Sequence, residues 1–103
     1  MAKKGYWVAS VDVNDPERYK QYLRENAPAF RKYGARFLVR GGDQEAVEGK
    51  LRGRIAVIEF KDYATAMACY RSTEYSAAKP HRTESALSDI VIIQGYDGRQ
   101  PTD

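Results

Sequence analysis

The chain has 103 residues, of which 43% are hydrophobic and 30% are charged, and its formal net charge is +3. This length supports one hydrophobic core, and the composition is ordinary for a soluble globular domain. The 17 basic residues are spread along the chain among 14 acidic ones. Nucleic-acid-binding domains instead gather basic residues in a stripe or a tail, so the pattern argues against a nucleic-acid partner.

Cys69 is the single cysteine. It cannot form an internal disulfide, which fits a reducing, intracellular setting, and a small buried apolar side chain is its simplest role. Residues 1–13 (MAKKGYWVASVDV) contain no long apolar run, so they fit neither a secretion signal nor a membrane span. We therefore expect a cytoplasmic protein without a membrane partner.

The first half of the chain predicts a strand followed by an interrupted helix. Residues 6–13 alternate in character and favour a half-buried strand. Residues 14–17 (NDPE) predict a helix start, because an Asx side chain caps the first amides and proline fits the first helical position. Pro28 predicts a kink or short break near residues 26–27, and Gly34 predicts the end of the helix.

Two strands and an arm follow. Residues 35–40 predict the second strand, and residues 54–60, apolar at consecutive positions, predict a third strand covered on both faces. The charged, glycine-bearing segment 41–53 between them predicts an exposed loop or hairpin arm.

The last part predicts two helices and a final strand. Asp62 can cap one helix, and residues 72–74 (STE) can cap a shorter one that Pro80 ends or bends. We expect Ser88-Asp89 to form a turn before a strand at residues 90–93, with a loose polar tail over residues 97–103.

The element order is strand, helix, strand, strand, helix, strand, which predicts one α+β domain over residues 1–96. Right-handed crossovers give a ferredoxin-like βαββαβ fold with a four-stranded antiparallel sheet and the helices on one face. The segments 55–58 and 90–93 are apolar on both faces, whereas the helices can cover only one. An exposed apolar sheet face is an interaction surface, so we expect a homodimer in which a second copy covers it.

A series of motifs runs in order from Gly5 to Tyr96: GYWVASVDVNDPERYKQY, YGARFLVRGG, RIAVIEF, ACYRSTEY, Arg82 and DIVIIQGY. In these motifs the chain resembles a family of bacterial proteins known as domain of unknown function 1330. One departure is Gly34-Ala35-Arg36, where the family pattern often has Gly-Gly-Arg. The resemblance implies the dimeric α+β barrel form of the ferredoxin-like fold.

The wider superfamily that the chain resembles includes cofactor-independent monooxygenases, muconolactone isomerases, chlorite dismutases and haem-degrading enzymes. These proteins place their pockets between the sheet and the helices. The resemblance therefore implies a pocket in that position, but it assigns no reaction, because a shared fold is weak evidence for function.

Three charged residues interrupt apolar strands, where an unpaired charge is costly. Arg36 and Arg40 share parity and should point to the same side of their strand. Glu59 lies on the neighbouring strand and could pair with one of them, but the sequence does not give the register. The arginines could hold a carboxylate or an enolate, with Glu59 as the base. A structural Arg–Glu pair that sets strand register or a dimer interface is the interpretation that the sequence favours.

Aromatic residues are further candidates for a ligand site. Tyr19, Tyr22, Tyr70, Tyr75 and Trp7 could line a pocket for a flat apolar ligand and orient it with their polar tips. A tyrosine stripe at helical spacing is more often part of the core with its hydroxyl groups at the edge, and the sequence favours that interpretation.

His81 is the only histidine. Histidine is the only type of side chain whose unperturbed pKa lies near neutrality. It follows Pro80 in a polar stretch and should be exposed, although it remains a candidate for moving a proton. Arg82 belongs to the family motif and is a candidate ligand-binding residue. One cysteine and one histidine cannot form a structural zinc site, so we expect neither a metal nor a cofactor.

Two classes of function remain open. In the first, a dimeric enzyme binds a small anionic or carbonyl-bearing metabolite through Arg36 or Arg40, while Glu59 or His81 moves a proton. In the second, the same pocket binds a metabolite without turnover, or the dimer is a structural module.

Overall fold

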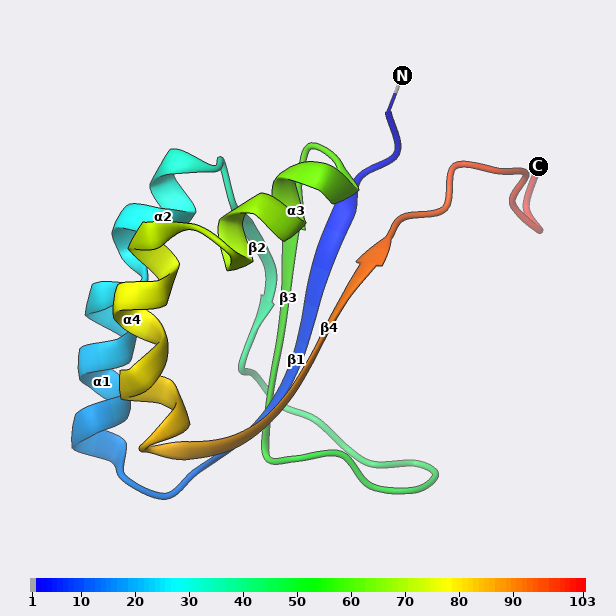
Figure 1. Cartoon of the computed structure of the whole chain (residues 1–103). Coiled ribbons are helices and arrows are strands. Elements are labelled where there is room, and N and C mark those ends of the chain that lie inside the picture. Colours follow the sequence, from blue (N-terminus) through cyan, green and yellow to red (C-terminus); the bar gives the residue numbers. More distant parts are fainter. Residues whose placement is uncertain (1) are drawn as a thin grey trace.

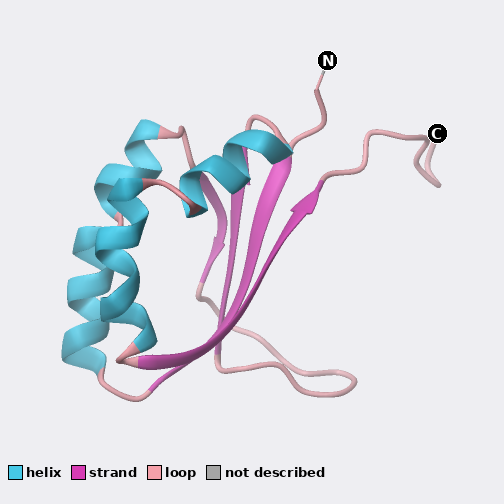
Figure 2. Cartoon of the chain, in the orientation of Figure 1, coloured by secondary structure: helices cyan, strands magenta, loops and turns pink. Residues whose placement is uncertain are grey.

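Strand β1 (Gly5–Val13) is a central strand of a four-stranded antiparallel sheet with the order β2-β3-β1-β4. The computed structural model describes residues 2–103. The elements that follow β1 are α1 (Pro16–Glu25), α2 (Ala27–Lys32), β2 (Arg36–Arg40), β3 (Arg54–Phe60), α3 (Tyr63–Tyr70), α4 (Thr73–Thr83) and β4 (Ala86–Gln94). These helices all cover one face of the sheet (Figures 1 and 2). The predicted α+β, ferredoxin-like βαββαβ fold is confirmed.

Trp7 on β1 lies at the centre of the core between the sheet and the helices. Its side chain is buried, and its indole Nε1 donates a hydrogen bond to the carbonyl oxygen of Ala66 on α3 (2.9 Å). The rings of Phe30, Tyr70 and Tyr75 meet it edge-on, at centroid distances of 5.3, 5.6 and 5.0 Å. Such edge-to-face pairs stabilise the core beyond the area that they bury.

Helices α1, α3 and α4 each begin after a capping side chain. Asp15, Asp62 and Ser72 accept hydrogen bonds from the backbone amides three residues further on, at 3.2, 2.7 and 3.1 Å. Asn26 separates α1 from α2, and Pro28 lies in the first turn of α2. The predicted break near residues 26–27 is therefore confirmed.

The last strand is longer than predicted. It pairs with β1 along its whole length, from Ala86 to Gln94, instead of beginning at residue 90. Ser88 and Asp89 were expected in a turn, but both lie within the strand because their backbone groups pair with β1. The prediction failed because two adjacent polar residues interrupt the alternation of apolar and polar side chains that identifies a strand in the sequence.

Pro80 does not end α4, which continues to Thr83. Its missing N–H costs one hydrogen bond of the helix, but its carbonyl oxygen still accepts one from the amide of Glu84 (3.0 Å). His81 therefore stays on the helix and is half-buried, whereas the sequence predicted exposure. Its Nδ1 is buried and has no hydrogen-bond partner in the described part of the chain.

A bulge in β2 separates the two arginines of that strand. Arg36 lies opposite Glu59 in the register, the register shifts between Phe37 and Val39, and Arg40 then lies opposite Ala56. One extra residue reverses the alternation of side chains along a strand. Arg36 therefore faces away from the helices and Arg40 faces the helix side, so the prediction that they share a side is wrong.

Valines form a row across the outer face of the sheet, the face away from the helices. Val39, Val57, Val8 and Val91 are successive register partners on β2, β3, β1 and β4. Leu87 and Ile93 on β4 also lie on this face and are exposed. The prediction that residues 55–58 and 90–93 are apolar on both faces is confirmed, and nothing within the described chain covers the outer one.

Residues 41–53 contain no helix or strand and project from the sheet on the side away from the helices (Figure 1). Arg52 fixes the base of this arm: its Nε donates to Asp89 (2.8 Å), its Nη1 donates to Asp12 (3.0 Å), and its backbone amide donates to Ser10 Oγ (2.8 Å). Among the described helices, none is long and apolar enough to cross a membrane.

Candidate functional site

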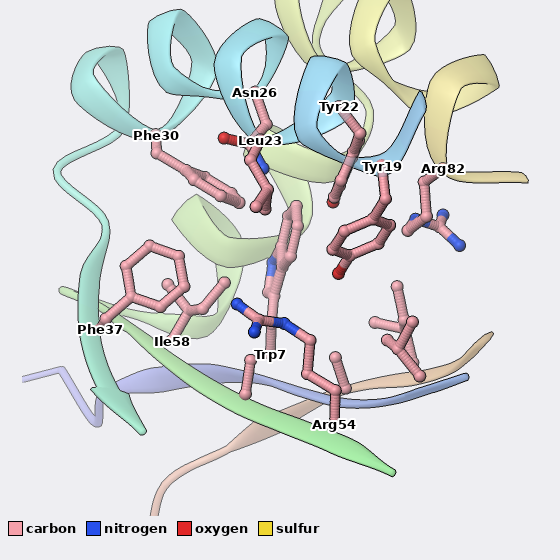
Figure 3. Close-up of a pocket in the computed structure, with 14 residues that line it drawn as sticks. Trp7, Tyr19, Tyr22, Leu23, Asn26, Phe30, Phe37, Arg54, Ile58 and Arg82 are labelled. Atoms are coloured by element: carbon pink, nitrogen blue, oxygen red, sulfur yellow. The ribbon is translucent and has the colours of Figure 1, made fainter. Parts of the chain in front are cut away.

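A cavity lies between the helix-facing side of the sheet and helices α1, α2 and α4 (Figure 3). Its walls are mainly apolar and aromatic. Its polar side chains come from two arginines, one asparagine and two tyrosines. The lining residues are Trp7, Ala9, Val11, Tyr19, Tyr22, Leu23, Asn26, Phe30, Phe37, Arg54, Ala56, Ile58, Arg82 and Ile90. This is the position that the resemblance implied for a pocket.

The cavity is small, with a volume of about 40 Å³. One water molecule needs about 10–15 Å³ on the same measure, so the cavity has room for a few waters. A larger guest requires side chains in the walls to move.

Arg82 brings a positive charge to the inner wall of the cavity. Its side chain comes from the last turn of α4, and the residue is only 6% exposed. Its Nε donates a hydrogen bond to Tyr75 Oη (3.2 Å), and that hydroxyl lies 2.7 Å from Tyr22 Oη. No carboxylate lies within 4.0 Å of the guanidinium group among residues 2–103.

Arg54 brings a second positive charge from the strand side. It is the first residue of β3, is half-buried, and places its guanidinium carbon 5.9 Å from the ring centroid of Tyr19. It also forms no ion pair within the described chain. Figure 3 shows Arg54 rising from the sheet and Arg82 descending from the helices, on either side of Tyr19.

Asn26 supplies an amide at the break between α1 and α2. The residue is only 4% exposed and lines the cavity. Its backbone amide donates to the carbonyl of Tyr22 (2.9 Å) and its carbonyl accepts from Phe30 (3.1 Å), which holds it in place. A fixed amide can both donate and accept, so it can recognise a carbonyl or hydroxyl group.

The cavity tyrosines are neutral phenols near neutral pH. Burial raises the pKa of Tyr22 well above its ordinary value, and the hydroxyl of Tyr75 beside it acts in the same direction. Burial also raises the pKa of Tyr19, against an opposing influence of Arg54. The lining contains no aspartate, glutamate or histidine. The cavity therefore offers a wall of hydrogen-bond donors with net positive charge and no ordinary proton acceptor.

Four of the residues proposed from sequence meet in this cavity: Trp7, Tyr19, Tyr22 and Arg82. Tyr70 lies beside them, with its ring 5.6 Å from Trp7, but it does not line the cavity. Arg40 lies just outside, on the same side of the sheet.

The remaining candidates lie elsewhere. Arg36 and Glu59 are register partners on the outer face, where Glu59 accepts a hydrogen bond from Tyr6 Oη (3.0 Å). His81 is half-buried and does not line the cavity. Neither of the proposed proton carriers, Glu59 and His81, therefore belongs to the lining that contains Arg82.

Sequence reasoning missed Arg54 and Asn26 as site residues. Arg54 lies an even number of residues from Ile58 and Phe60 on the same strand, and both of these are core residues. Strand alternation therefore indicated that Arg54 also faces the core. Asn26 had a weaker signal, because a polar residue at a helix break is normally exposed. The residues described contain no group of three His, Cys, Asp or Glu side chains that could hold a metal ion.

Solved structures with the same fold share little sequence with this chain. A protein of unknown function from Rhodopseudomonas palustris has a TM-score of 0.74 at 17% identity, over 95% of this chain and 86% of its own. SnoaB, a cofactor-independent oxygenase from Streptomyces nogalater, has a TM-score of 0.61 at 13% identity, over 96% of each chain. A proposed antibiotic biosynthesis monooxygenase from Nitrosomonas europaea has a TM-score of 0.64 at 16% identity, over 94% of each chain.

These similarities show the fold that the chain shares with these proteins. Among curated proteins, none matches the chain significantly. A family model does match residues 4–96, almost the whole described chain. The chain belongs to the family described as Domain of unknown function (DUF1330).

Proposed function

We propose that this protein binds a small organic anion with a flat apolar body in the cavity between the sheet and the helices. The observation that carries the proposal is Arg82, a buried guanidinium group with one hydrogen bond to a neutral phenol and no carboxylate partner within residues 2–103. Removing an arginine charge from water without a counter-charge is costly. A carboxylate or enolate in the cavity would offset that cost.

The rest of the lining supports the same class of ligand. Trp7, Phe30 and Phe37 offer apolar and aromatic surface for the body of the ligand. Arg54 adds a second cation, and Asn26 adds an amide for a carbonyl or hydroxyl substituent. We expect the anionic end to lie against the arginines and the ring against the aromatic residues.

Binding without turnover is the activity that the geometry supports best, because the lining has no carboxylate or imidazole to accept a proton. A cofactor-independent oxygenase or an isomerase is the second candidate. Its support is the aromatic cavity, which shields a ligand from water, together with the fold shared with SnoaB.

We further propose that the functional unit is a homodimer in which the outer sheet faces pack together. The row of valines on that face, with Leu87 and Ile93, makes a continuous apolar surface on the unpaired side of the sheet. Apolar sheet faces of this kind are normally covered, and a second copy related by a two-fold axis is the simplest cover.

Benzoate and benzamide test the binding proposal, because they share a ring and nearly a size but differ in charge. Trp7 is the only tryptophan and lines the cavity, so its fluorescence reports occupancy. We expect benzoate to change the emission of Trp7 and to bind at least about tenfold more tightly than benzamide, a difference of about 1.4 kcal/mol. Equal affinities, or no binding of either compound, would exclude the anion site.

Native mass spectrometry of the gently purified protein separates the two classes of function. A mass of two chains plus a small organic acid supports the binding proposal and supplies the natural ligand. Oxygen uptake or a product of altered mass, on incubation with that ligand in air, identifies an enzyme; an unchanged ligand identifies a binding protein.

A further inference from the structure

We propose that anionic ligands reach the cavity at the edge of the sheet, between α2 and β2, and that Arg40 is the charge that draws them to this opening. The inference rests on the proposed function and deepens it by naming the route and the residue that controls it.

A surface groove lies next to the cavity at this edge. Its lining residues are Leu23, Asn26, Ala27, Phe30, Arg31, Ala35, Phe37 and Arg40. Leu23, Asn26, Phe30 and Phe37 also line the cavity. One layer of side chains therefore separates the groove from the cavity, and a small rearrangement of this layer would join them.

Phe37 is the part of the layer that is easiest to move. It lies on β2, a strand of only five residues at the edge of the sheet, and its side chain is half-buried. Its ring meets Phe30 edge-on at a centroid distance of 5.7 Å. The other residues of this layer, Leu23, Asn26 and Phe30, lie on helices or between them. An edge strand is held by hydrogen bonds on one side only, so β2 can move more easily than the helices.

Arg40 covers Phe37 from the groove side, with its guanidinium carbon 4.3 Å from the centroid of the ring. It reaches this position because of the bulge between Phe37 and Val39, without which Arg40 would face the outer side with Arg36. Bulges often re-aim a side chain near a functional site. Here the bulge places a charge at the mouth of the groove.

The arginines along this route lack acidic partners. Arg31 and Arg40 line the groove, Arg54 and Arg82 line the cavity, and none of the four forms an ion pair within residues 2–103. A cleft lined by one sign of charge raises the association rate of an oppositely charged ligand. An anion at the groove would therefore move toward progressively more buried positive charge.

Stopped-flow fluorescence of Trp7 with benzoate tests the route. Arg40→Gln should slow association about three- to tenfold at low ionic strength, and the difference should shrink at high salt. The dissociation rate should change little, because Arg40 does not line the cavity. Arg36→Gln is the matched control, since it removes the same charge from the opposite face of the same strand and should leave both rates unchanged.

Phe37→Ala tests whether the aromatic ring closes the passage. Opening a gate should accelerate association and dissociation together, so that both rates rise while the affinity changes less than either. A change in dissociation alone would show that Phe37 is only a wall of the cavity.

The outcomes separate the two proposals. Failure of benzoate to bind the unmodified protein would overturn the proposed function and the route with it. Tight binding of benzoate with equal association rates in the Arg40→Gln and Arg36→Gln proteins would overturn the route alone. Circular dichroism spectra and unfolding curves of each variant establish that the fold is intact.

Discussion

The Nε of Arg82 lies 3.2 Å from the hydroxyl of Tyr75, and this is the one hydrogen bond that the guanidinium makes within the described chain. The tyrosine hydroxyl is neutral, so it satisfies a donor without balancing the charge. Arg82 is thus held in position with its charge available to a ligand. This relationship distinguishes Arg82, which we propose as the ligand-binding arginine, from the structural Arg–Glu pair that the sequence favoured for Arg36 and Arg40.

Replacing Arg82 should separate ligand affinity from stability. Arg82→Met removes a buried charge that has no carboxylate partner, so no opposite charge is left unpaired and the free energy of unfolding should fall by less than about 1 kcal/mol, or rise. Benzoate affinity should fall about 10- to 100-fold, which corresponds to the loss of a hydrogen bond to a charged group. Urea unfolding and fluorescence titration measure the two effects. A large loss of stability with unchanged affinity would make Arg82 a purely structural residue.

The hydroxyl of Tyr75 should contribute more to the free energy of unfolding than the hydroxyl of an exposed tyrosine. Tyr75→Phe removes the partner of both Arg82 and Tyr22 and leaves two buried polar groups unsatisfied. The expected loss in the free energy of unfolding is about 1–3 kcal/mol. Tyr96→Phe is the control, because Tyr96 is exposed. Equal effects in the two variants would show that the buried hydroxyl pair contributes nothing specific.

Stability should fall at alkaline pH because of Tyr22. Burial raises its pKa in the folded protein well above the ordinary value of a tyrosine, while in the unfolded chain the pKa remains about 10. The unfolded chain therefore loses this proton first, so the stabilisation is complete below about pH 10 and declines as the pH rises further. Urea unfolding at a series of pH values should show a shallower alkaline decline for Tyr22→Phe than for the unmodified protein. Parallel curves would contradict the raised pKa.

The fold could be predicted from the sequence because its determinants are local. Helix caps such as Asp15 and Asp62 and the strand alternation around Trp7 depend on residues close in the chain. Of the two outcomes predicted for Pro80, an end or a bend of the helix, the end is wrong, because α4 continues to Thr83 and the amide of Glu84 still bonds to the carbonyl of Pro80. The local sequence around Pro80 does not reveal that the helix continues past it.

The site was less predictable because it depends on register. Arg36 and Arg40 have the same parity in the sequence, and only the bulge between Phe37 and Val39 places them on opposite faces. The position of Arg36 opposite Glu59 also follows only from the register of β2 and β3. The charge of the cavity could not be predicted, since it requires knowing that no acidic residue of the described chain forms an ion pair with Arg54 or Arg82.

The outer face of the sheet supplies the last prediction, on assembly. Val8 lies at the middle of the valine row, and Tyr63 on α3 is equally exposed, at 40%, on the helix side. Val8→Lys should convert the dimer to monomers, because a charge in the centre of a sheet-to-sheet interface would be buried without a partner. Tyr63→Lys introduces the same charge away from that face and should leave the dimer intact. Analytical ultracentrifugation at micromolar concentration distinguishes the two. If the unmodified protein sediments as a monomer, or if both variants remain dimers, the valine row is not the interface.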